Sequence, residues 1–231
     1  MGNEGDDWKA LTSDPNIFNN LCTKLGFDTN KHGVVFQDLF AMEDWAYEMT
    51  MPPHVGVLMC IDFDKVAGKE NDNSTPKDQV PADLFYMHQI SKNACGSVGL
   101  YHILGNARSK YPFEEGSVLD NFFKTDRSDW KSNADQFHGD KALKSQHQVS
   151  VKQTTLGGDE NEVFCHFIAF VEHNGIVWEL DGTKKGPICR GATTYQSFLS
   201  DVGGIVKKEY VDPNPDLKLF SLMTVAGKPL D

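Results

Sequence analysis

The sequence lacks the features of membrane, metal-binding and phosphate-binding proteins. In its 231 residues no apolar run reaches the roughly 20 positions that a membrane-spanning helix needs. It shows no internal repeat, no glycine-rich phosphate loop and no array of metal ligands at the usual spacing. A signal peptide has a charged stretch followed by an apolar one, whereas the first residues of this sequence are polar. We therefore expect no signal peptide. These absences indicate a protein that works with its own side chains, and we expect no cofactor and no resident metal.

Basic residues are also scarce. The 22 Lys and Arg residues are outnumbered by 33 Asp and Glu residues, which gives a net charge of −11. A nucleic-acid-binding surface needs a basic face, so this balance argues against nucleic acid and suits a partner with a basic surface or tail. Hydrophobic residues make up 39% of the chain, enough for an ordinary core. We expect a single domain over residues 1–231, monomeric and without membrane attachment.

Cysteine is present, but without the pattern of disulfides. The number of cysteines is odd, and no two of them have the paired spacing of a disulfide framework or a zinc site. Free thiols fit a reducing compartment, so we expect the protein in the cytoplasm, with the nucleus as a second compartment. The five positions are Cys22, Cys60, Cys95, Cys165 and Cys189.

One cysteine, Cys95, lies where a helix is predicted to begin. Asn93 is a good N-cap and Ala94 then opens the helix. A thiol in the first turn faces the positive end of the helix, which favours the thiolate and makes the sulfur a nucleophile. Gly96 leaves room for a substrate backbone, and Gln89 can add a side-chain donor at the same place. The alternative is that Cys95 is only a small buried hydrophobic residue.

An imidazole and a carboxylate that can assist this thiol follow further along the chain. Residues 162–172 form a nearly unbroken apolar run, typical of a buried strand, and contain His166. Asn174-Gly175 predicts a two-residue turn, and the register of the resulting hairpin makes Asp181 the diagonal neighbour of His166. A carboxylate there can fix the imidazole tautomer and stabilise the imidazolium. The alternative is a hydrogen-bonded core histidine and a turn-forming aspartate.

The sequence pattern also predicts the other main elements. Asp14 and Pro15 begin a helix that Gly26 ends, and Ser117 caps another. A shorter helix is expected to stop before Pro52-Pro53. The predicted helices cover residues 15–25, 42–50, 94–110 and 197–210, with further helical segments from 117 to 144, and the predicted strands cover 55–63, 162–172, 176–182 and 217–225.

The motifs around the candidate residues resemble those of one enzyme family, the ubiquitin C-terminal hydrolases. The likeness extends over the whole chain, from the segment after Trp8 to the segment before Phe220, as in short single-domain members. The motifs are Tyr86-Met87-His88-Gln89, Asn93-Ala94-Cys95-Gly96-Ser97, His166-Phe167-Ile168-Ala169 and Glu179-Leu180-Asp181-Gly182.

The resemblance implies a role for each candidate residue. Cys95 would be the nucleophile, His166 the general base and acid, Asp181 the residue that orients His166, and Gln89 an oxyanion-hole donor. It also implies a papain-like thiol hydrolase fold of the α/β (α+β) class, with a central, mostly antiparallel sheet flanked by helices and a knotted backbone. A segment at about residues 147–162 would cross over the active-site entrance.

The implied activity is that of a cysteine-dependent deubiquitinase, which hydrolyses amide, ester or short peptide adducts at the C-terminal glycine of ubiquitin. Two alternatives stay open at this point, namely a protein that binds and stabilises free ubiquitin with little turnover, and a hydrolase for a related ubiquitin-like modifier. Two positions depart from the family pattern, His88 in place of a basic residue and Thr12 in place of an acid. Neither belongs to the catalytic set, but both bear on how the N-terminal segment contacts ubiquitin.

Overall fold

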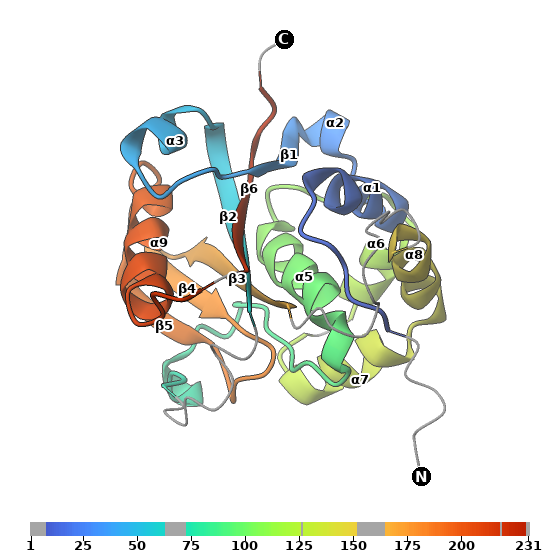
Figure 1. Ribbon diagram of the computed structural model, residues 1–231. Coiled ribbons are helices and arrows are strands. Elements are labelled where there is room, and N and C mark those ends of the chain that lie inside the picture. The colour runs from blue at the N-terminus through green and yellow to red at the C-terminus, as the bar shows by residue number, and fades with distance from the viewer. Residues whose placement is uncertain (1–7, 63–72, 126, 152–164, 218, 230–231) are drawn as a thin grey trace.

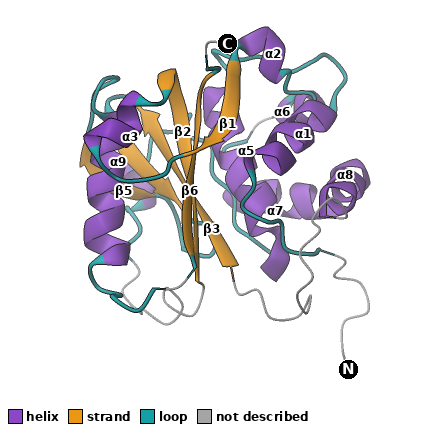
Figure 2. Cartoon of the chain, turned by 45° about the horizontal axis from the view of Figure 1, so that its top comes forward, coloured by secondary structure: helices purple, strands orange, loops and turns teal. Residues whose placement is uncertain are grey.

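The computed structural model describes residues 8–62, 73–125, 127–151, 165–217 and 219–229. In these ranges the strands form one antiparallel sheet in the order β1-β6-β2-β3-β4-β5, and helices cover both of its faces (Figures 1 and 2). This arrangement confirms the predicted mixed class with a mostly antiparallel sheet. The strands are β1 Val34–Asp38, β2 Met51–Asp62, β3 Cys165–His173, β4 Ile176–Leu180, β5 Ile188–Ala192 and β6 Phe220–Gly227.

The helices fall into two groups, one on each face of the sheet (Figure 1). The α5 side carries most of them, whereas α3 and α9 cover the other face. The helices are α1 Pro15–Leu25, α2 Thr29–His32, α3 Asp44–Glu48, α5 Cys95–Ala107, α6 Val118–Phe123, α7 Trp130–Gly139, α8 Lys141–Val151 and α9 Phe198–Val206, with 3₁₀ turns at Lys77–Gln79 and Lys92–Ala94 and a π-helical turn at Lys207–Val211.

Strand β2 lies in the middle of the sheet and contributes to both cores. Its successive side chains alternate between the faces, as in any strand. Leu58 packs into the core under α5, whereas Val57 and Met59 pack under α3 and α9. Burial on both faces explains why β2 and β3 read as continuous apolar runs rather than as alternating patterns.

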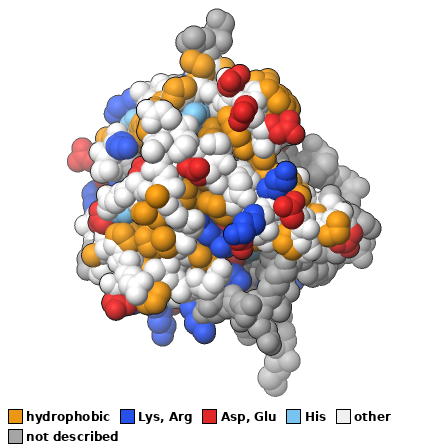
Figure 3. Space-filling view, turned by 90° about the vertical axis from the view of Figure 1, so that its left-hand side faces the viewer, with side chains coloured by type: hydrophobic (Ala, Val, Ile, Leu, Met, Phe, Trp, Pro, Cys, Tyr) orange, Lys and Arg blue, Asp and Glu red, His pale blue; other side chains and the backbone are white. Residues whose placement is uncertain are grey.

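Exposed apolar side chains lie on and next to α3. Phe40, Trp45 and Met49 are 72%, 50% and 61% exposed. Figure 3 views the side of the molecule that α3 and α9 cover, where apolar side chains are interspersed with charged ones. These residues precede the start of β2, whereas His166 pairs with Ile61 at its other end.

Several local predictions are confirmed. The Asp14 side chain accepts a hydrogen bond from Asn16 N at 2.8 Å at the start of α1, and Gly26 ends that helix with φ of 100°. The β3–β4 hairpin turns at Asn174 and Gly175, both with positive φ, and pairs His173 with Ile176 and Ala169 with Leu180, as the predicted register requires.

Other elements differ from the prediction. Strand β2 begins at Met51 and includes Pro52 and Pro53, which lie where β2 pairs only with β6 and its register is irregular. Proline is tolerated there because one edge of the strand needs no backbone donor. Helix α3 is accordingly shorter than predicted, and α5 ends at Ala107. The expected knot depends on the complete path of the chain, including residues outside the described ranges, and stays a prediction.

Candidate active site

Cys95 is the first residue of α5. A 3₁₀ turn at Lys92–Ala94 leads directly into the helix, so Ala94 occupies the N-cap position with helical backbone angles and makes no side-chain cap. The prediction that Asn93 caps the helix is therefore wrong. Its side chain instead donates to Trp8 O at 3.0 Å and ties the N-terminal segment to the start of α5. The placement of Cys95 at the positive end of the helix is confirmed.

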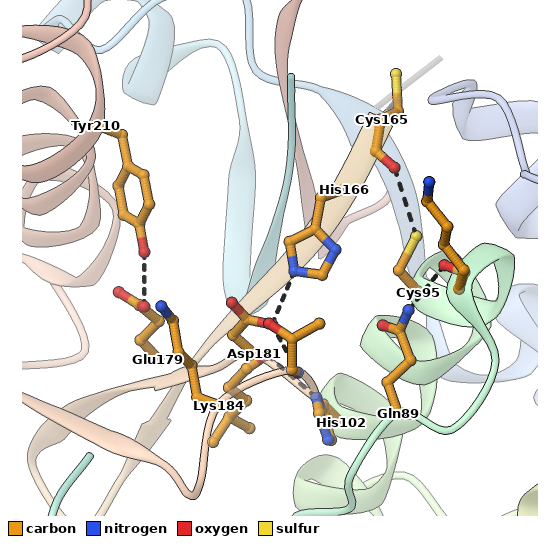
Figure 4. A network of polar contacts seen from close by, with 12 residues as sticks. Gln89, Cys95, His102, Cys165, His166, Glu179, Asp181, Lys184 and Tyr210 are labelled. Atoms are coloured by element: carbon orange, nitrogen blue, oxygen red, sulfur yellow. Dashed lines mark hydrogen bonds and ion pairs between the residues drawn. The ribbon is translucent and has the colours of Figure 1, made fainter. Parts of the chain in front are cut away.

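The Cys95 side chain is enclosed by the protein. The residue is 2% exposed, and its Sγ lies 3.7 Å from the backbone oxygen of Cys165. In its protonated form the sulfur donates a weak hydrogen bond to this carbonyl. Cys165 begins β3 and directly precedes His166, so the contact holds the sulfur beside the strand that carries the imidazole (Figure 4).

His166 and Asp181 form the pair that the hairpin register predicted. His166 Nε2 lies 2.8 Å from Asp181 Oδ1, and both residues are 2% exposed. The same carboxylate oxygen accepts hydrogen bonds from the Thr183 backbone N–H at 2.9 Å and hydroxyl at 2.8 Å. The imidazole lies between Asp181 and Cys95, with Nδ1 on the side of the sulfur (Figure 4). Asp181 thus fixes the ring from the edge opposite to Cys95.

The electrostatics of the pair favour a charged imidazole. Burial opposes the charge on His166, but the Asp181 carboxylate and the neighbouring Cys95 outweigh it and raise the pKa of His166 to about 10. Burial would likewise raise the pKa of Asp181, yet His166 and the Thr183 hydrogen bonds hold that pKa below its ordinary value. At neutral pH the site therefore contains an imidazolium bonded to a carboxylate.

Gln89 completes the cluster from the loop before α5. Its backbone N–H donates to Gly182 O at 2.8 Å, and its side-chain Nε2 donates to Lys92 O at 2.8 Å. A side-chain amide has two N–H groups, so this nitrogen can donate to a second acceptor. Figure 4 shows this amide beside the start of α5, close to Cys95. The structure thus brings together all four residues that the sequence singled out.

Sequence reasoning gave no role to two residues beneath this cluster, Tyr86 and His102. Tyr86 OH lies 2.8 Å from Asp181 O, and the fully buried His102 bonds to backbone atoms of Leu180 and Met87. The available signal was a histidine in the middle of the mostly apolar α5, two turns after Cys95. Helical spacing alone gives no partner for this histidine.

The described part of the chain contains neither a group of metal ligands nor a helix able to span a membrane. Its His, Cys, Asp and Glu side chains form no group of three or more that could hold a metal ion. Among the same residues, every helix is too short or too polar to cross a bilayer. The described side chains of the cluster are those of nucleophilic and acid–base chemistry.

Comparisons with known proteins agree with this cluster. The family model described as ubiquitin carboxyl-terminal hydrolase, family 1, matches residues 8–210. Ubiquitin carboxyl-terminal hydrolase 3 of Arabidopsis thaliana is 30% identical over 228 residues, which cover 96% of this chain and 94% of the relative. The isozyme L1 of Sus scrofa is 27% identical over 206 residues, which cover 87% and 90% of the two chains.

A solved structure shows the same fold. The UCH37 catalytic domain of Trichinella spiralis, crystallised with ubiquitin vinyl methyl ester bound, superposes with a TM-score of 0.71. The match covers 97% of each chain at 22% identity. The family model and the Arabidopsis relative, which both span most of the sequence, establish that the chain belongs to family 1 of the ubiquitin carboxyl-terminal hydrolases.

Proposed function

We propose that this chain acts as a cysteine deubiquitinase of its family, with Cys95 as nucleophile, His166 as general base and acid, Asp181 as the residue that orients His166, and Gln89 as oxyanion-hole donor. The observation that carries the proposal is the contact of 2.8 Å between His166 Nε2 and Asp181 Oδ1, which leaves Nδ1 facing Cys95. The substrates would be amide, ester or short peptide adducts at the C-terminal glycine of ubiquitin.

The first half of the reaction forms a thioester. The Cys95 thiolate attacks the glycine carbonyl carbon, the C–S bond forms, and the carbonyl electron pair moves to oxygen. The second N–H of the Gln89 side chain can donate to this oxyanion, and the bond to Lys92 O holds the amide in place beforehand. When the intermediate collapses, the bond to the leaving group breaks and His166 gives its proton to the departing amine or alcohol.

The second half releases ubiquitin. His166, now neutral, takes a proton from water as the water oxygen attacks the thioester carbon. Collapse of this second oxyanion breaks the C–S bond and restores the thiolate beside the imidazolium. Asp181 stays ionised throughout, because its pKa is held below the ordinary range.

The burial of Cys95 is the observation that supports a second candidate function, the binding of free ubiquitin with slow turnover. At 2% exposure, the sulfur cannot meet a glycine carbonyl unless groups around it move. A protein that binds free ubiquitin and turns over slowly would be compatible with this closure. The complete set of Gln89, Cys95, His166 and Asp181 supports hydrolysis over pure binding, because a binding protein has no need of an oriented imidazole.

Covalent labelling separates these possibilities. We expect ubiquitin with a C-terminal vinyl methyl ester to modify Cys95 stoichiometrically, and ubiquitin-like modifiers with the same group to react more slowly. Cys95→Ala should lower turnover of ubiquitin aminocoumarin at least about 1000-fold while calorimetry still detects ubiquitin binding. Cys22→Ala, on the buried face of α1, is the matched control and should keep wild-type turnover. Turnover by Cys95→Ala near the wild-type rate would refute the assignment.

The remaining expectations concern the surroundings of the site. The proposed crossover segment, at about residues 147–162, falls partly on α8, which ends at Val151, and otherwise on residues 152–162, outside the described ranges. We propose that it limits the size of the leaving group. We also propose that the protein is a monomer and that it acts in the cytoplasm, with the nucleus as a second compartment. The scattered free cysteines support a reducing compartment.

A further inference from the structure

A buried histidine on α5 links the three segments that carry the proposed catalytic residues. His102 is fully buried, two turns after Cys95 on the same helix. Its Nδ1 lies 3.2 Å from Leu180 O, directly before Asp181, and its Nε2 lies 3.2 Å from Met87 N, two residues before Gln89. One ring therefore touches the backbone on both sides of the cluster (Figure 4).

Both edges of the ring contact backbone groups. A carbonyl oxygen only accepts hydrogen bonds, so with the proton on Nδ1 the ring donates to Leu180 O at 3.2 Å and its Nε2 accepts from the Met87 N–H. Nε2 also lies 3.1 Å from Met87 O, to which it donates when it carries the proton itself. Burial lowers the pKa of His102 to about 4, although the backbone bonds with Met87 and Leu180 act against it. The ring is thus neutral at physiological pH and contacts the backbone of Leu180 on one edge and that of Met87 on the other.

Residues 85–87 depend on side chains for their backbone hydrogen bonds, because they belong to no strand. Asn106, one turn after His102, accepts from Phe85 N at 2.8 Å and donates to Phe85 O at 2.9 Å. Asn133 of α7 donates to Tyr86 O at 3.0 Å. Buried backbone groups that lack a ladder need such partners. The segment leading to Gln89 is therefore clipped to α5 by His102 and Asn106.

Tyr86 extends the link to the Asp181 turn. Its ring stacks on the imidazole of His102, with centroids 5.1 Å apart and planes 11° apart. Its hydroxyl lies 2.8 Å from Asp181 O and 2.8 Å from Lys184 O. The turn that carries the catalytic carboxylate is thus held at Leu180 by His102 and at Asp181 by the stacked Tyr86.

We infer that His102 is a positioning residue of the hydrolase, whose two ring nitrogens set the places of Asp181 and Gln89 relative to Cys95. The inference rests on the proposed function, because it assigns a task to a residue that does not touch the reacting atoms. The three catalytic segments are far apart in the sequence, and a displacement of about 1 Å can cost roughly 100-fold in rate. A rigid group between them is one means of preventing such displacement.

Two conservative variants separate the two edges of the ring. The amide nitrogen of Asn lies as many bonds from Cα as Nδ1, so His102→Asn can keep the bond to Leu180 O and loses the Met87 contact. The amide of Gln reaches as far as Nε2, so His102→Gln can keep the Met87 contact and loses the bond to Leu180. His102→Phe loses both bonds and keeps a ring for stacking on Tyr86.

The expected readout is a selective loss of kcat in ubiquitin aminocoumarin cleavage. His102→Phe should lower kcat roughly 100-fold while KM stays within about twofold of wild type. In double-mutant cycles, Gln89→Ala should lower kcat little further in the His102→Asn background, because both substitutions affect the Met87 edge of the ring and the Gln89 segment. Asp181→Asn should likewise lower kcat little further in the His102→Gln background, because both affect the Leu180 edge and the Asp181 turn. Ile103→Val, which trims the next side chain on α5 where it packs at Gly56, is the control for core packing and should leave kcat unchanged.

A second readout does not require turnover. The NMR titration of His166 should be unchanged in His102→Asn and moved to lower pH in His102→Gln, since only the latter loosens Asp181. A wild type that leaves the aminocoumarin substrate intact would refute the proposed function, and this titration would still test His102. Wild-type kcat in a folded His102→Phe variant, or in both amide variants if Phe prevents folding, would overturn the positioning role. Full additivity in both double-mutant cycles, or identical His166 titrations in all variants, would also overturn the positioning role.

Discussion

At the scale of single residues, neighbours decide which cysteine can react. Burial raises the pKa of the Cys22 thiol, and a hydrogen bond with Cys165 together with burial raises that of Cys60. Both side chains behave as small hydrophobic groups in the core. Cys95 is equally buried but lies at the start of a helix beside an imidazolium, so its surroundings offer positive charge to a thiolate.

The charge on His166 makes stability depend on pH in a defined direction. A folded-state pKa near 10, above the ordinary value of 6.5, stabilises the folded protein fully below about pH 6.5, and this contribution is lost as pH rises toward 10. Asp181→Asn removes the partner charge. We expect the loss in free energy of unfolding caused by this substitution to be greatest near pH 6 and to shrink steadily toward pH 10.

Urea unfolding at a series of pH values measures this difference. NMR of the imidazole should show His166 charged at pH 7.5 in the wild type and titrating at lower pH in Asp181→Asn, as removal of a partner charge requires. His173→Gln is a control, because that histidine pairs with the exposed Asp83 at the surface. A stability difference that grew as pH rose would contradict the ion pair.

At the scale of elements, the β3–β4 hairpin was the most predictable part of the site. Asn174-Gly175 fixes the turn, the turn fixes the register, and the register places Asp181 beside His166. The start of α5 was less predictable, because Asn93 is a strong N-cap residue by type but is held by Trp8 O, a contact distant in sequence. Strands β1 and β5 were missed because each is short and lies at an edge of the sheet.

The close approach of the turn after Asp181 to the loop of Gln89 explains why residue 182 is a glycine. A Cβ at Gly182 would lie 2.9 Å from Gln89 Cβ and 3.1 Å from Gln89 N, whose N–H donates to Gly182 O. A backbone collision cannot be relieved by a change of rotamer. We expect Gly182→Ala to displace Gln89 and lower kcat by roughly 10- to 100-fold, with little change in KM, because an oxyanion donor acts only along the reaction path.

Steady-state kinetics on ubiquitin aminocoumarin checks this expectation. Gly204→Ala is the matched control, because no atom lies within 4 Å of its added Cβ and the residue is exposed on α9. It should raise the free energy of unfolding by up to about 1 kcal/mol through helix propensity, with unchanged kcat. Unchanged kcat in Gly182→Ala would show that Gln89 is not held by this contact.

At the scale of the whole molecule, the site is assembled by the sheet and α5 from segments that no local pattern connects. Cys95, His166, Asp181 and Gln89 could be predicted from the sequence through motifs and one hairpin register. The contact of Cys95 with Cys165 O and the contacts of His102 with Leu180 and Met87 could not be predicted. Those contacts depend on how α5 packs against β3 and β4, which is a property of the tertiary fold rather than of any local periodicity.

Substrate size is a prediction at this scale. The proposed crossover segment, at about residues 147–162, begins on the last turns of α8 and precedes the strand that carries His166, so ordered elements flank it on both sides. We expect efficient cleavage of ubiquitin esters, small amides and short peptide extensions, and very poor cleavage of folded di-ubiquitin. A flexible insert between Gly157 and Gly158 should raise the rate on di-ubiquitin and leave the rate on ubiquitin aminocoumarin nearly unchanged.

The same insert at Gly116, in the connection before α6, serves as a control for the effect of lengthening a surface loop. Gel-based cleavage of di-ubiquitin and fluorescence release from the aminocoumarin give the two rates. Equal rates of the wild type on both substrates, or an insert at Gly157-Gly158 without effect, would show that this segment is not the filter.

The position of β6 has a consequence for the synthesis of the protein. This strand is the last in chain order, yet it lies between β1 and β2 and pairs with both. On the ribosome, the N-terminal strands must therefore wait with open hydrogen-bonding edges until residue 227 has emerged. Contacts between residues this distant in sequence form slowly, and unpaired edges invite association with other chains. It follows that the sheet closes only after translation has passed β6, and that nascent chains stalled before it are the species that most need chaperone protection.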